Sequence, residues 1–390
     1  MKERIAIVAG IRSPFCKGGG VMRDMAADDI GAYVVAELMA KSGVDPSKVD
    51  ELIFGNVIQP AQSANIARIV AVKAGLPVKV PAFTVNRNCA SGLEAITNGA
   101  DKIILGHDDI VVAGGTESMS NFPVEVRKDY KEFLTRLGKA KSFSQKLAAA
   151  FSFRPSFLMP EIPELLDPLC SLNMGQTAEV LAREFKVTRE EQDQFALNSQ
   201  HRAEKAIAEG RLADEIEPIP VGPKYATVQT QDEGPRANQT LEALAKLKPA
   251  FDKFTGTVTA GNSSQITDGA AAVILMKESK AKELGLEPLG YIRDYAAAGL
   301  QPSRMGLGPA FAISKVLKKT GLNLSDIDLI EINEAFAAQV LACVRALASD
   351  DFARKELDRD KAVGILDLEK LNVNGGAIAL GHPLGASGAR

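Results

Sequence analysis

The chain has 390 residues, 24 % of them charged and 46 % hydrophobic, which is typical of a soluble protein with a large core and two or more domains. Its formal net charge of −3 excludes an overall field that would attract nucleic acid or a membrane. The four cysteines, Cys16, Cys89, Cys170 and Cys343, contain no C-x-x-C pair, which argues against a zinc site and a disulfide framework. We therefore expect reduced thiols and a cytoplasmic location.

In chain order, the first apolar run stops at Arg12 and has no cleavage site, so it favours a buried strand over a secretory signal. The longest later run, 269–276, is too short to span a bilayer. Short β-rich runs alternate with helical patterns, which predicts an α/β fold. Strands are expected at 4–9, 51–57, 82–86, 109–114, 270–276, 290–296, 328–333 and 371–374. Helices are expected at 29–42, 63–75, 91–105, 175–186, 189–209, 309–320 and 335–349.

Two segments of the chain match each other. Residues 36–56 align with 314–334 at a constant offset of 278, so that Gly43 meets Gly321. Each copy has the pattern of a helix, a glycine C-cap, a short link and a buried strand. One such match can arise by chance, but two halves built on one plan is the better interpretation.

A different region, 119–250, lies between the halves. Its segment 127–154 has eight Lys or Arg against two Asp or Glu, interleaved with Phe, Leu and Tyr. Such a basic amphipathic segment can lie on a membrane surface or bind a partner. The alternative is the solvated face of a helical loop domain that covers a ligand. We expect a first half at 1–118, completed by 251–276, then a loop domain at 119–250 and a second half at 277–390.

The segment NRNCASGLEA places Cys89 between a short strand and a helix that begins with small residues. At a helix N-terminus the macrodipole and the free N–H groups favour a thiolate, and the backbone N–H of Cys89 can form half of an oxyanion hole. The alternative is a small buried cysteine in a helix–sheet contact. A nucleophilic cysteine also needs a base within reach.

Three histidines are candidates for that base. His107 lies in a polar turn and His201 on a charged helix face, so both are expected at the surface. His382, in ALGHPLGASGA, follows an expected strand, and the proline after it suits the first turn of a helix. This position resembles that of Cys89 in the first half. Cys89 and His382 are therefore the expected nucleophile and base.

Two further segments carry candidate groups. Asn333 follows a buried strand, where it is either a helix N-cap or an amide that holds a water or orients an oxyanion. The small residues of 256–276 form either a tight loop or one wall of a channel for an extended ligand. The sequence contains no G-x-G-x-x-G after its first strand, no P-loop and no G-x-S-x-G, which argues against dinucleotide, nucleotide-phosphate and serine-hydrolase sites.

With NRNCASGLEA, TAGNSSQITDGAAA, NEAFAAQ and GGAIALGHPLGASGAR in this order, the whole chain resembles the thiolases, the acetyl-CoA C-acyltransferases. The resemblance implies a five-layer αβαβα core of two duplicated halves, with an inserted loop domain over the active site. It also implies the activity of a 3-ketoacyl-CoA thiolase in fatty-acid β-oxidation. A biosynthetic acetoacetyl-CoA thiolase and a condensing β-ketoacyl synthase are alternatives within the same fold.

Residue by residue, the resemblance implies that Cys89 carries the acyl group, His382 activates it, and Asn333 positions a water in an oxyanion hole. The pantetheine arm of CoA is expected at Ser264 and Ala260, with Met174 near the acyl-pantetheine. CoA and acyl-CoA thioesters are the expected ligands, and no metal or organic cofactor is expected. The family alone implies a homodimer or homotetramer.

The sequence departs from the family in two respects. The family has a second cysteine, in a C-x-G motif after the GHP motif, whereas Cys343 lies before that motif in an expected helix. We therefore expect the second half to be incomplete at its C-terminus, and the chain to fold poorly or turn over slowly. An inactive scaffold or lipid-associated subunit is the corresponding alternative.

The second departure concerns the subfamily. The long basic loop and LAKLKPAF (244–251) resemble the β-subunits of fatty-acid oxidation trifunctional complexes. Those relatives commonly carry His where this chain has Asn333. Partnership with a hydratase/dehydrogenase subunit therefore stays open.

Overall fold

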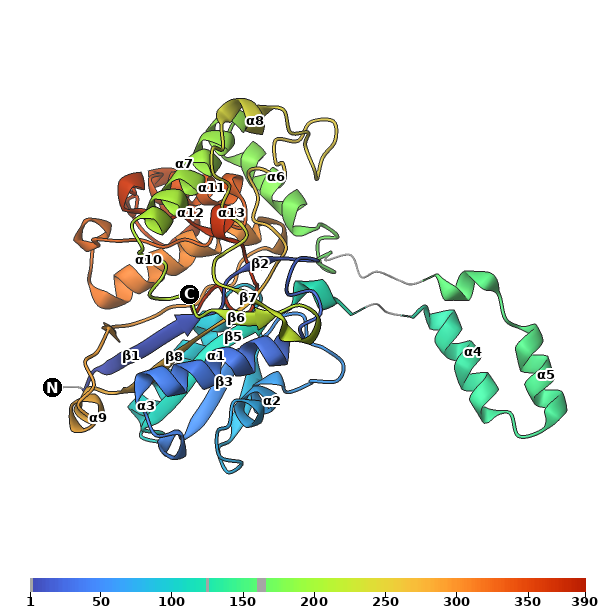
Figure 1. The fold of residues 1–390 in the computed structure, drawn as a ribbon. Helices are drawn as coiled ribbons and strands as arrows, with labels where there is room; N and C mark the ends of the chain where they lie inside the picture. Colours follow the sequence, from blue (N-terminus) through green and yellow to red (C-terminus); the bar gives the residue numbers. More distant parts are fainter. Residues whose placement is uncertain (1–2, 124–125, 160–165) are drawn as a thin grey trace.

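The computed structural model describes residues 3–123, 126–159 and 166–390, and a mixed β-sheet forms its centre (Figure 1). Within these residues the sheet has seven strands in the order β4-β3-β5-β8-β1-β9, with β2 paired to β8. The strands are β1 (Ile5–Arg12), β2 (Cys16–Lys17), β3 (Glu51–Gly55), β4 (Ala82–Val85), β5 (Ile110–Glu117), β8 (Thr267–Lys277) and β9 (Gly290–Ile292). β3 is parallel to β4 and β5, whereas β8 and β1 are antiparallel to their neighbours.

Helices and one small ribbon complete the described elements. The ribbon pairs β6 (Ile219–Val221) with β7 (Thr227–Gln229). The helices are α1 (Ala27–Ser42), α2 (Ile66–Lys73), α3 (Ser91–Leu105), α4 (Lys128–Lys139), α5 (Phe143–Phe151), α6 (Met174–Glu184), α7 (Arg189–Ala208), α8 (Leu241–Ala245), α9 (Glu278–Glu283), α10 (Gly308–Thr320), α11 (Ala337–Leu347), α12 (Asp350–Glu356) and α13 (Ala377–Leu380).

The sheet buries both of its faces, as β5 shows. Successive strand residues point to opposite sides, so Val112 packs in a cluster with Val34 of α1 and Val70 of α2. Its neighbour Val111 packs on the other side, in a cluster with Ala95 of α3. Helices therefore cover the sheet from both sides, which confirms the expected α/β class.

A second core lies among the helices α6, α10, α11 and α12 (Figure 1). Leu181, Leu317, Val340 and Phe352, one from each of these helices, belong to the same buried cluster. Cys343 is fully buried there, and its thiol donates to the carbonyl oxygen of Gly306 at 3.2 Å. This cluster gives the second half a core of its own.

The expected strands at 328–333 and 371–374 do not form a ladder. A single parallel bridge joins Ile330 to Leu371. The next residue, Asn372, has φ 48°, a left-handed conformation that interrupts a strand. Its side chain takes over the pairing, because Oδ1 accepts from the Ile332 N–H and Nδ2 donates to the Ile332 carbonyl, each at 2.9 Å. The expected strand at 290–296 is shorter, as β9, and adds to the first sheet beside β1.

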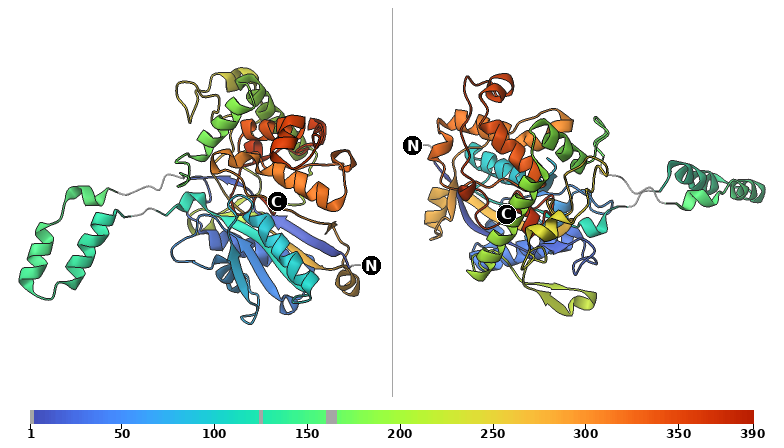
Figure 2. Two further views of the ribbon diagram at one scale, coloured as in Figure 1. Left: turned by 180° about the vertical axis from the view of Figure 1, so that it is seen from behind. Right: turned by 90° about the horizontal axis from the view of Figure 1, so that it is seen from above.

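Residues 127–154 form an arm, α4 and α5, that projects from the body (Figures 1 and 2). The rings of Tyr130, Phe133 and Phe153 pack within the arm, together with Phe157. No helix in the three described ranges is long and apolar enough to cross a bilayer. The domain boundaries at 118 and 250 stay a prediction.

Candidate active site

Cys89 lies in the turn between β4 and α3, and its side chain is partly exposed. Asn88, before it, has φ 47°, a left-handed conformation that Asn tolerates better than most residues. Ser91 closes the turn: its Oγ accepts from the Arg87 N–H at 2.8 Å and donates to the Asn88 carbonyl at 2.6 Å. The sequence NRNCAS therefore folds as a tight elbow that places Cys89 directly before the helix.

The thiol of Cys89 is protonated at neutral pH. Burial, with a smaller contribution from the Glu117 carboxylate, raises its pKa to about 11, and its own backbone N–H only partly opposes this. The sequence analysis expects this helix N-terminus to favour a thiolate, whereas burial shifts the pKa of the thiol in the opposite direction. A base must therefore remove the proton before Cys89 can act as a nucleophile.

His382 is buried, with 4 % of its surface exposed, and its ring is bonded on both sides. Nε2 lies 3.2 Å from the amide nitrogen of Asn333, and Nδ1 lies 2.6 Å from Oγ of Ser387. The backbone N–H donates to Thr267 Oγ1 at 3.0 Å. Burial, with a contribution from the charge of Arg390, lowers the pKa of His382 to about 4, so the ring is neutral.

The other two histidines, His107 and His201, are exposed, as expected from the sequence. Neither has a side-chain hydrogen bond or ion pair among the described contacts that would mark a site. Among the three histidines, His382 is therefore the one whose ring is buried and hydrogen-bonded at both nitrogens.

The segment that carries His382 packs directly on the helix that follows Cys89. A methyl group at Gly92 of α3 would lie 2.8 Å from the Gly385 carbonyl oxygen and from the Ala389 nitrogen. One at Gly388 would lie 2.5 Å from the Leu93 nitrogen. The turn after His382 and the first turn of α3 are therefore in contact, although no hydrogen bond joins the Cys89 and His382 side chains in the described structure.

Glu117, which the sequence analysis did not identify, lies at the end of β5 and bonds the turn after His382. It is fully buried and accepts four hydrogen bonds: from the N–H groups of Val57, Ile58 and Gly385 and from the amide of Asn56, all at 2.9–3.1 Å. Burial raises its pKa to about 7 despite these bonds. A carboxylate at the end of the apolar run DIVVAGGTE was the signal that could have revealed it.

Asn333 lies at the surface, next to the buried Ile332 of the second core. It is exposed, and α11 begins only at Ala337 with Phe336 as its N-cap residue, so the N-cap alternative for Asn333 is excluded. The adjacent Glu334 is buried and accepts from Ser199 Oγ at 2.6 Å, from Asn372 Nδ2 at 2.8 Å and from the Ile378 N–H at 3.2 Å. Glu334 thereby fixes this segment of the chain, from which the neighbouring Asn333 reaches His382.

Two of the three residues expected at the CoA arm lie beside this segment. The N–H of Ser264 donates to the Ala335 carbonyl at 2.9 Å. Met174 packs against the small apolar cluster that includes Phe336, with Ala335 at its edge. Ala260 is exposed on the loop that leads to Ser264, and no contact of its side chain with the site residues is shown. The structure therefore brings Ser264 and Met174 to residues 335–336, just after Asn333, and leaves Ala260 at the surface.

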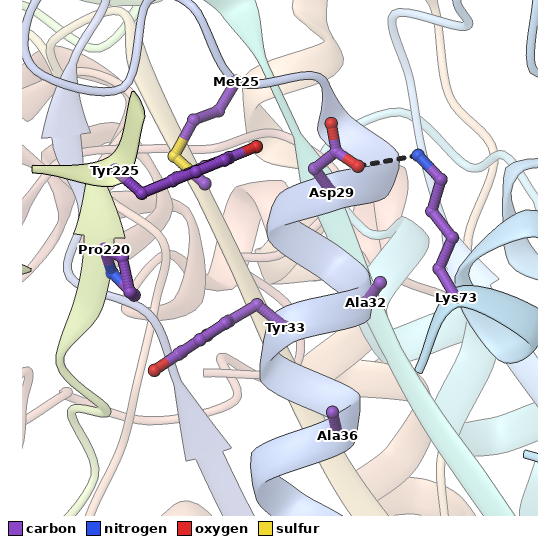
Figure 3. Close-up of a pocket in the computed structure, with 8 residues that line it drawn as sticks. All are labelled: Met25, Asp29, Ala32, Tyr33, Ala36, Lys73, Pro220 and Tyr225. Atoms are coloured by element: carbon purple, nitrogen blue, oxygen red, sulfur yellow. Dashed lines mark hydrogen bonds and ion pairs between the residues drawn. The ribbon is translucent and has the colours of Figure 1, made fainter. Parts of the chain in front are cut away.

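A separate cavity of about 510 Å³ lies between α1 and the β6–β7 ribbon (Figure 3). It is lined by Met25, Asp29, Ala32, Tyr33, Ala36, Lys73, Pro220 and Tyr225. Its lysine pairs with Asp29 at 2.6 Å, and the hydroxyl of Tyr33 donates to the Pro218 carbonyl at 2.8 Å. These polar groups already have partners, and none of the expected site residues lines the cavity.

Comparison with known proteins identifies the family of the chain. The family model described as the thiolase N-terminal domain matches residues 5–279, and that of the thiolase C-terminal domain matches residues 286–390. The chain is 43 % identical over 389 residues to the 3-ketoacyl-CoA thiolase of Yersinia enterocolitica, covering 100 % of this chain and 89 % of the relative. It is 44 % identical, with the same coverage, to that of Photorhabdus laumondii.

Solved structures are similar over the whole chain. The Bacillus anthracis acetyl-CoA acetyltransferase has a TM-score of 0.84 at 41 % identity, covering 100 % of this chain and 90 % of that one. Human mitochondrial 3-ketoacyl-CoA thiolase has a TM-score of 0.82 at 42 % identity with the same coverage, and its complex with CoA a TM-score of 0.82 at 40 % identity, covering 100 % and 89 %. The expected fold is thereby confirmed, and the chain belongs to the thiolase family.

Proposed function

We propose that this chain is a 3-ketoacyl-CoA thiolase, in which Cys89 is the nucleophile, His382 the base and Asn333 the partner of that base. The observation that carries the proposal is the 3.2 Å contact between Asn333 Nδ2 and His382 Nε2. The segment that contains His382 packs against α3, the helix that follows Cys89. The sequence similarity to curated 3-ketoacyl-CoA thiolases over the full chain supports the substrate class.

Before substrate binds, the protonation states of Cys89 and His382 allow a proton to pass from the thiol to the imidazole. Cys89 is a thiol with a pKa near 11 and His382 a neutral imidazole with a pKa near 4, so neither group is ionised before substrate binds. As the Cys89 sulfur adds to the 3-oxo carbon of a 3-ketoacyl-CoA, its proton passes to Nε2 of His382. The carbonyl electron pair moves to oxygen, and Asn333 or a water on it donates to that oxyanion.

Collapse of the tetrahedral adduct breaks the bond between C2 and C3. Its electron pair leaves as the enolate of acetyl-CoA, which the CoA thioester stabilises, and protonation by His382, which holds the proton of Cys89, converts the enolate to acetyl-CoA. The resemblance assigns this protonation to a cysteine of a C-x-G motif, and the given sequence has no cysteine after His382. In the second half-reaction, the thiol of free CoA attacks the Cys89 thioester, and the released Cys89 sulfur regains a proton.

The proposal includes no metal and no organic cofactor. The positions of Ser264 and Met174, at the segment that follows Asn333, support an approach of the CoA arm from that side. Binding of CoA is further supported by the CoA complex of the human relative.

Isotope exchange tests the proposal on the acyl-transfer steps alone. Acetyl-CoA is incubated with labelled CoA, and label enters acetyl-CoA only if Cys89 carries the acetyl group between the two. We expect exchange by the chain and none by Cys89→Ala. A folded chain that exchanges no label would contradict the proposal. Relative acylation by acetoacetyl-CoA and by longer 3-ketoacyl-CoA substrates then separates the degradative activity from the biosynthetic alternative.

We also propose that this protein forms homo-oligomers and that the arm docks on an anionic membrane. β4, at the edge of the described sheet, has no strand on its outer side and can accept the same strand of a second copy. On the arm, Phe143 and Phe151 are 82 % and 83 % exposed among basic side chains. Light scattering tests the first proposal. Co-sedimentation with anionic vesicles tests the second: the chain should bind, and a Phe143→Ser/Phe151→Ser variant should bind more weakly. If the chain does not bind such vesicles at low or at high salt, the arm is better explained as a site for a protein partner.

A further inference from the structure

We infer that Ser387 is a positioning residue: its hydroxyl holds His382 in the tautomer whose Nε2 carries a lone pair, which can take the proton of Cys89 in place of the Asn333 hydrogen bond. The inference deepens the proposed function, because it rests on His382 being the base of the acyl-transfer reaction. It is carried by an unbroken chain of hydrogen bonds through the buried imidazole. The sequence analysis did not assign Ser387 a role.

The first part of the argument concerns Nε2. The atom of Asn333 that faces it, at 3.2 Å, is the amide nitrogen Nδ2. An amide NH₂ group only donates hydrogen bonds, so Nε2 must be the acceptor and must carry a lone pair. A neutral imidazole has one N–H, which then lies on Nδ1.

The second part starts from the other end of the chain of bonds and reaches the same tautomer. Ser387 Oγ lies 3.0 Å from the Pro383 carbonyl oxygen, which only accepts, so the hydroxyl hydrogen points to that carbonyl. Its oxygen is then an acceptor for the Nδ1–H of His382 at 2.6 Å. Donation therefore runs in one direction: from Asn333 to Nε2, and from Nδ1 through Ser387 to Pro383.

The backbone holds Ser387 in place for this contact. The N–H groups of Ala386 and Ser387 both donate to the Pro383 carbonyl, at 2.9 and 3.0 Å, so 383–387 is a closed helical turn. The same turn is fixed from outside by Glu117, which accepts from the Gly385 N–H at 2.9 Å. The hydroxyl therefore needs no rearrangement to meet Nδ1.

Loss of the Ser387 hydroxyl would remove the acceptor that holds the hydrogen on Nδ1 of His382. Nδ1–H would become a donor without a partner in a buried site, which is unfavourable. Moving the hydrogen to Nε2, with the Asn333 amide turned so that its Oδ1 accepts, removes that loss, but Nε2 then cannot accept the proton of Cys89. A base of correct position and wrong tautomer is a poor catalyst.

The direct test is nitrogen NMR of the histidine ring. The exposed His107 and His201 are first replaced by Gln, which leaves His382 as the single ¹⁵N-labelled histidine. We expect the signal of a protonated nitrogen at Nδ1 and of an unprotonated nitrogen at Nε2. An Nε2–H tautomer in this protein would overturn the inference, whatever the behaviour of any Ser387 variant.

Three variants then connect the tautomer to the reaction. Ser387→Ala should shift the hydrogen toward Nε2 and slow acetyl exchange at saturating acetyl-CoA by about 10–100-fold with KM unchanged. Ser387→Thr keeps a hydroxyl at this partly exposed position, so it should restore the Nδ1–H tautomer and the rate of acetyl exchange. Thr320→Ala is the matched control, because it removes a hydroxyl that bonds a carbonyl four residues earlier, Val316, far along α10.

These outcomes separate the inference from the proposed function. An unchanged tautomer or full exchange activity in Ser387→Ala overturns the positioning role. A parent protein with Nδ1–H but no acetyl exchange keeps the role of Ser387 in fixing the ring and contradicts the thiolase activity instead.

Discussion

The two copies of the repeated segment, 36–56 and 314–334, fold alike until they reach the sheet and then diverge. In each copy a helix ends at a left-handed glycine, Gly43 with φ 70° and Gly321 with φ 69°, and one turn of 3-10 helix follows. In the first copy the chain then enters β3, which is bonded on both sides by β4 and β5. In the second copy the corresponding residues make one bridge. Caps and turns are local, whereas a strand exists only through its neighbours.

A second comparison concerns the residues at and just after these segments, where each half places a buried carboxylate next to an asparagine amide. In the first half Asn56 donates to Glu117 at 2.9 Å, and in the second half Asn372 donates to Glu334 at 2.8 Å. Position 56 corresponds to position 334 in the repeat, so amide and carboxylate have exchanged places. Both carboxylates also accept backbone N–H groups of the segment that carries His382.

Together the two carboxylates hold that segment at both ends. Glu334 accepts from the Ile378 N–H before His382, and Glu117 accepts from the Gly385 N–H after it. The base therefore belongs to the second half in sequence but is positioned by both halves. The following predictions test this division of roles.

The largest effects are expected for the nucleophile of the first half and the base of the second. Cys89→Ala should abolish acetyl exchange, and His382→Asn, which keeps a polar group near Nδ1 but deletes Nε2, should lower it by about 10²–10⁴-fold. Because the two groups act as a unit, the double variant should be no slower than Cys89→Ala. Exchange that survives in His382→Asn would show that another group takes the proton.

The next largest effects are expected for the carboxylates, and they should differ. Each oxygen of the ionised Glu117 accepts two bonds, so Glu117→Gln leaves two buried donors without an acceptor and should cost about 2–6 kcal/mol at pH 8, where the carboxylate is ionised. In Glu334 one oxygen accepts a single bond, so Glu334→Gln can leave one donor unpaired and should cost about 1–3 kcal/mol. Urea unfolding measures both, and equal costs would contradict the bonding pattern.

The two halves should also respond to pH in opposite directions. Glu117, with a pKa raised to about 7 from 4.5, binds its proton in the folded state first, so its contribution to stability falls as pH rises from about 4.5 to about 7. His382, with a pKa lowered to about 4 from 6.5, makes a contribution that falls as pH drops from about 6.5 to about 4. Each corresponds to about 3 kcal/mol.

Unfolding at several pH values separates these two contributions. The cost of Glu117→Gln should be larger at pH 5 than at pH 8, because only the parent loses the contribution of Glu117. The cost of His382→Asn should be larger at pH 7 than at pH 4. A cost that does not change with pH in either variant would contradict the corresponding shift in pKa.

The smallest effect is expected where the halves touch. Gly92→Ala places a methyl group 2.8 Å from backbone atoms of the turn after His382, and should cost about 1–3 kcal/mol and slow acetyl exchange. Gly99→Ala, on the same helix, meets only the side chains of Leu275 and Val111 at 3.0 Å, and should leave exchange unchanged. If both variants exchange equally fast, the contact at Gly92 does not position His382.

The sequence predicted the parts of the site that depend on local pattern. Cys89 before a helix of small residues, His382 before a proline and Asn333 at a strand exit were all expected, and the structure connects the last two directly. The long helices agree with their expected positions within a few residues, because their apolar periodicity and glycine caps are local signals. The assignment of catalytic roles to these residues stays a proposal.

What the sequence could not predict depends on residues far apart in the chain. Glu117 and Gly385 are separated by 268 positions, and only the folded packing shows that one accepts from the other. The strand at 371–374 was expected from its apolar residues, but the left-handed Asn372 and its side-chain bonds replace the ladder. The helix end that favours a thiolate at Cys89 is visible in the sequence, whereas only the folded structure shows the desolvation that raises the pKa of its thiol.

The most direct test is to locate the acyl group on the protein. The chain is exposed briefly to acetyl-CoA, digested at low pH and analysed by mass spectrometry, with Cys89→Ala treated in parallel. The account predicts one acetyl group, on the peptide that contains Cys89, and none in the variant. Acetylation of Cys170 instead, or none on the folded protein, would contradict the assignment of Cys89 and His382 as the nucleophile and base of an acyltransferase.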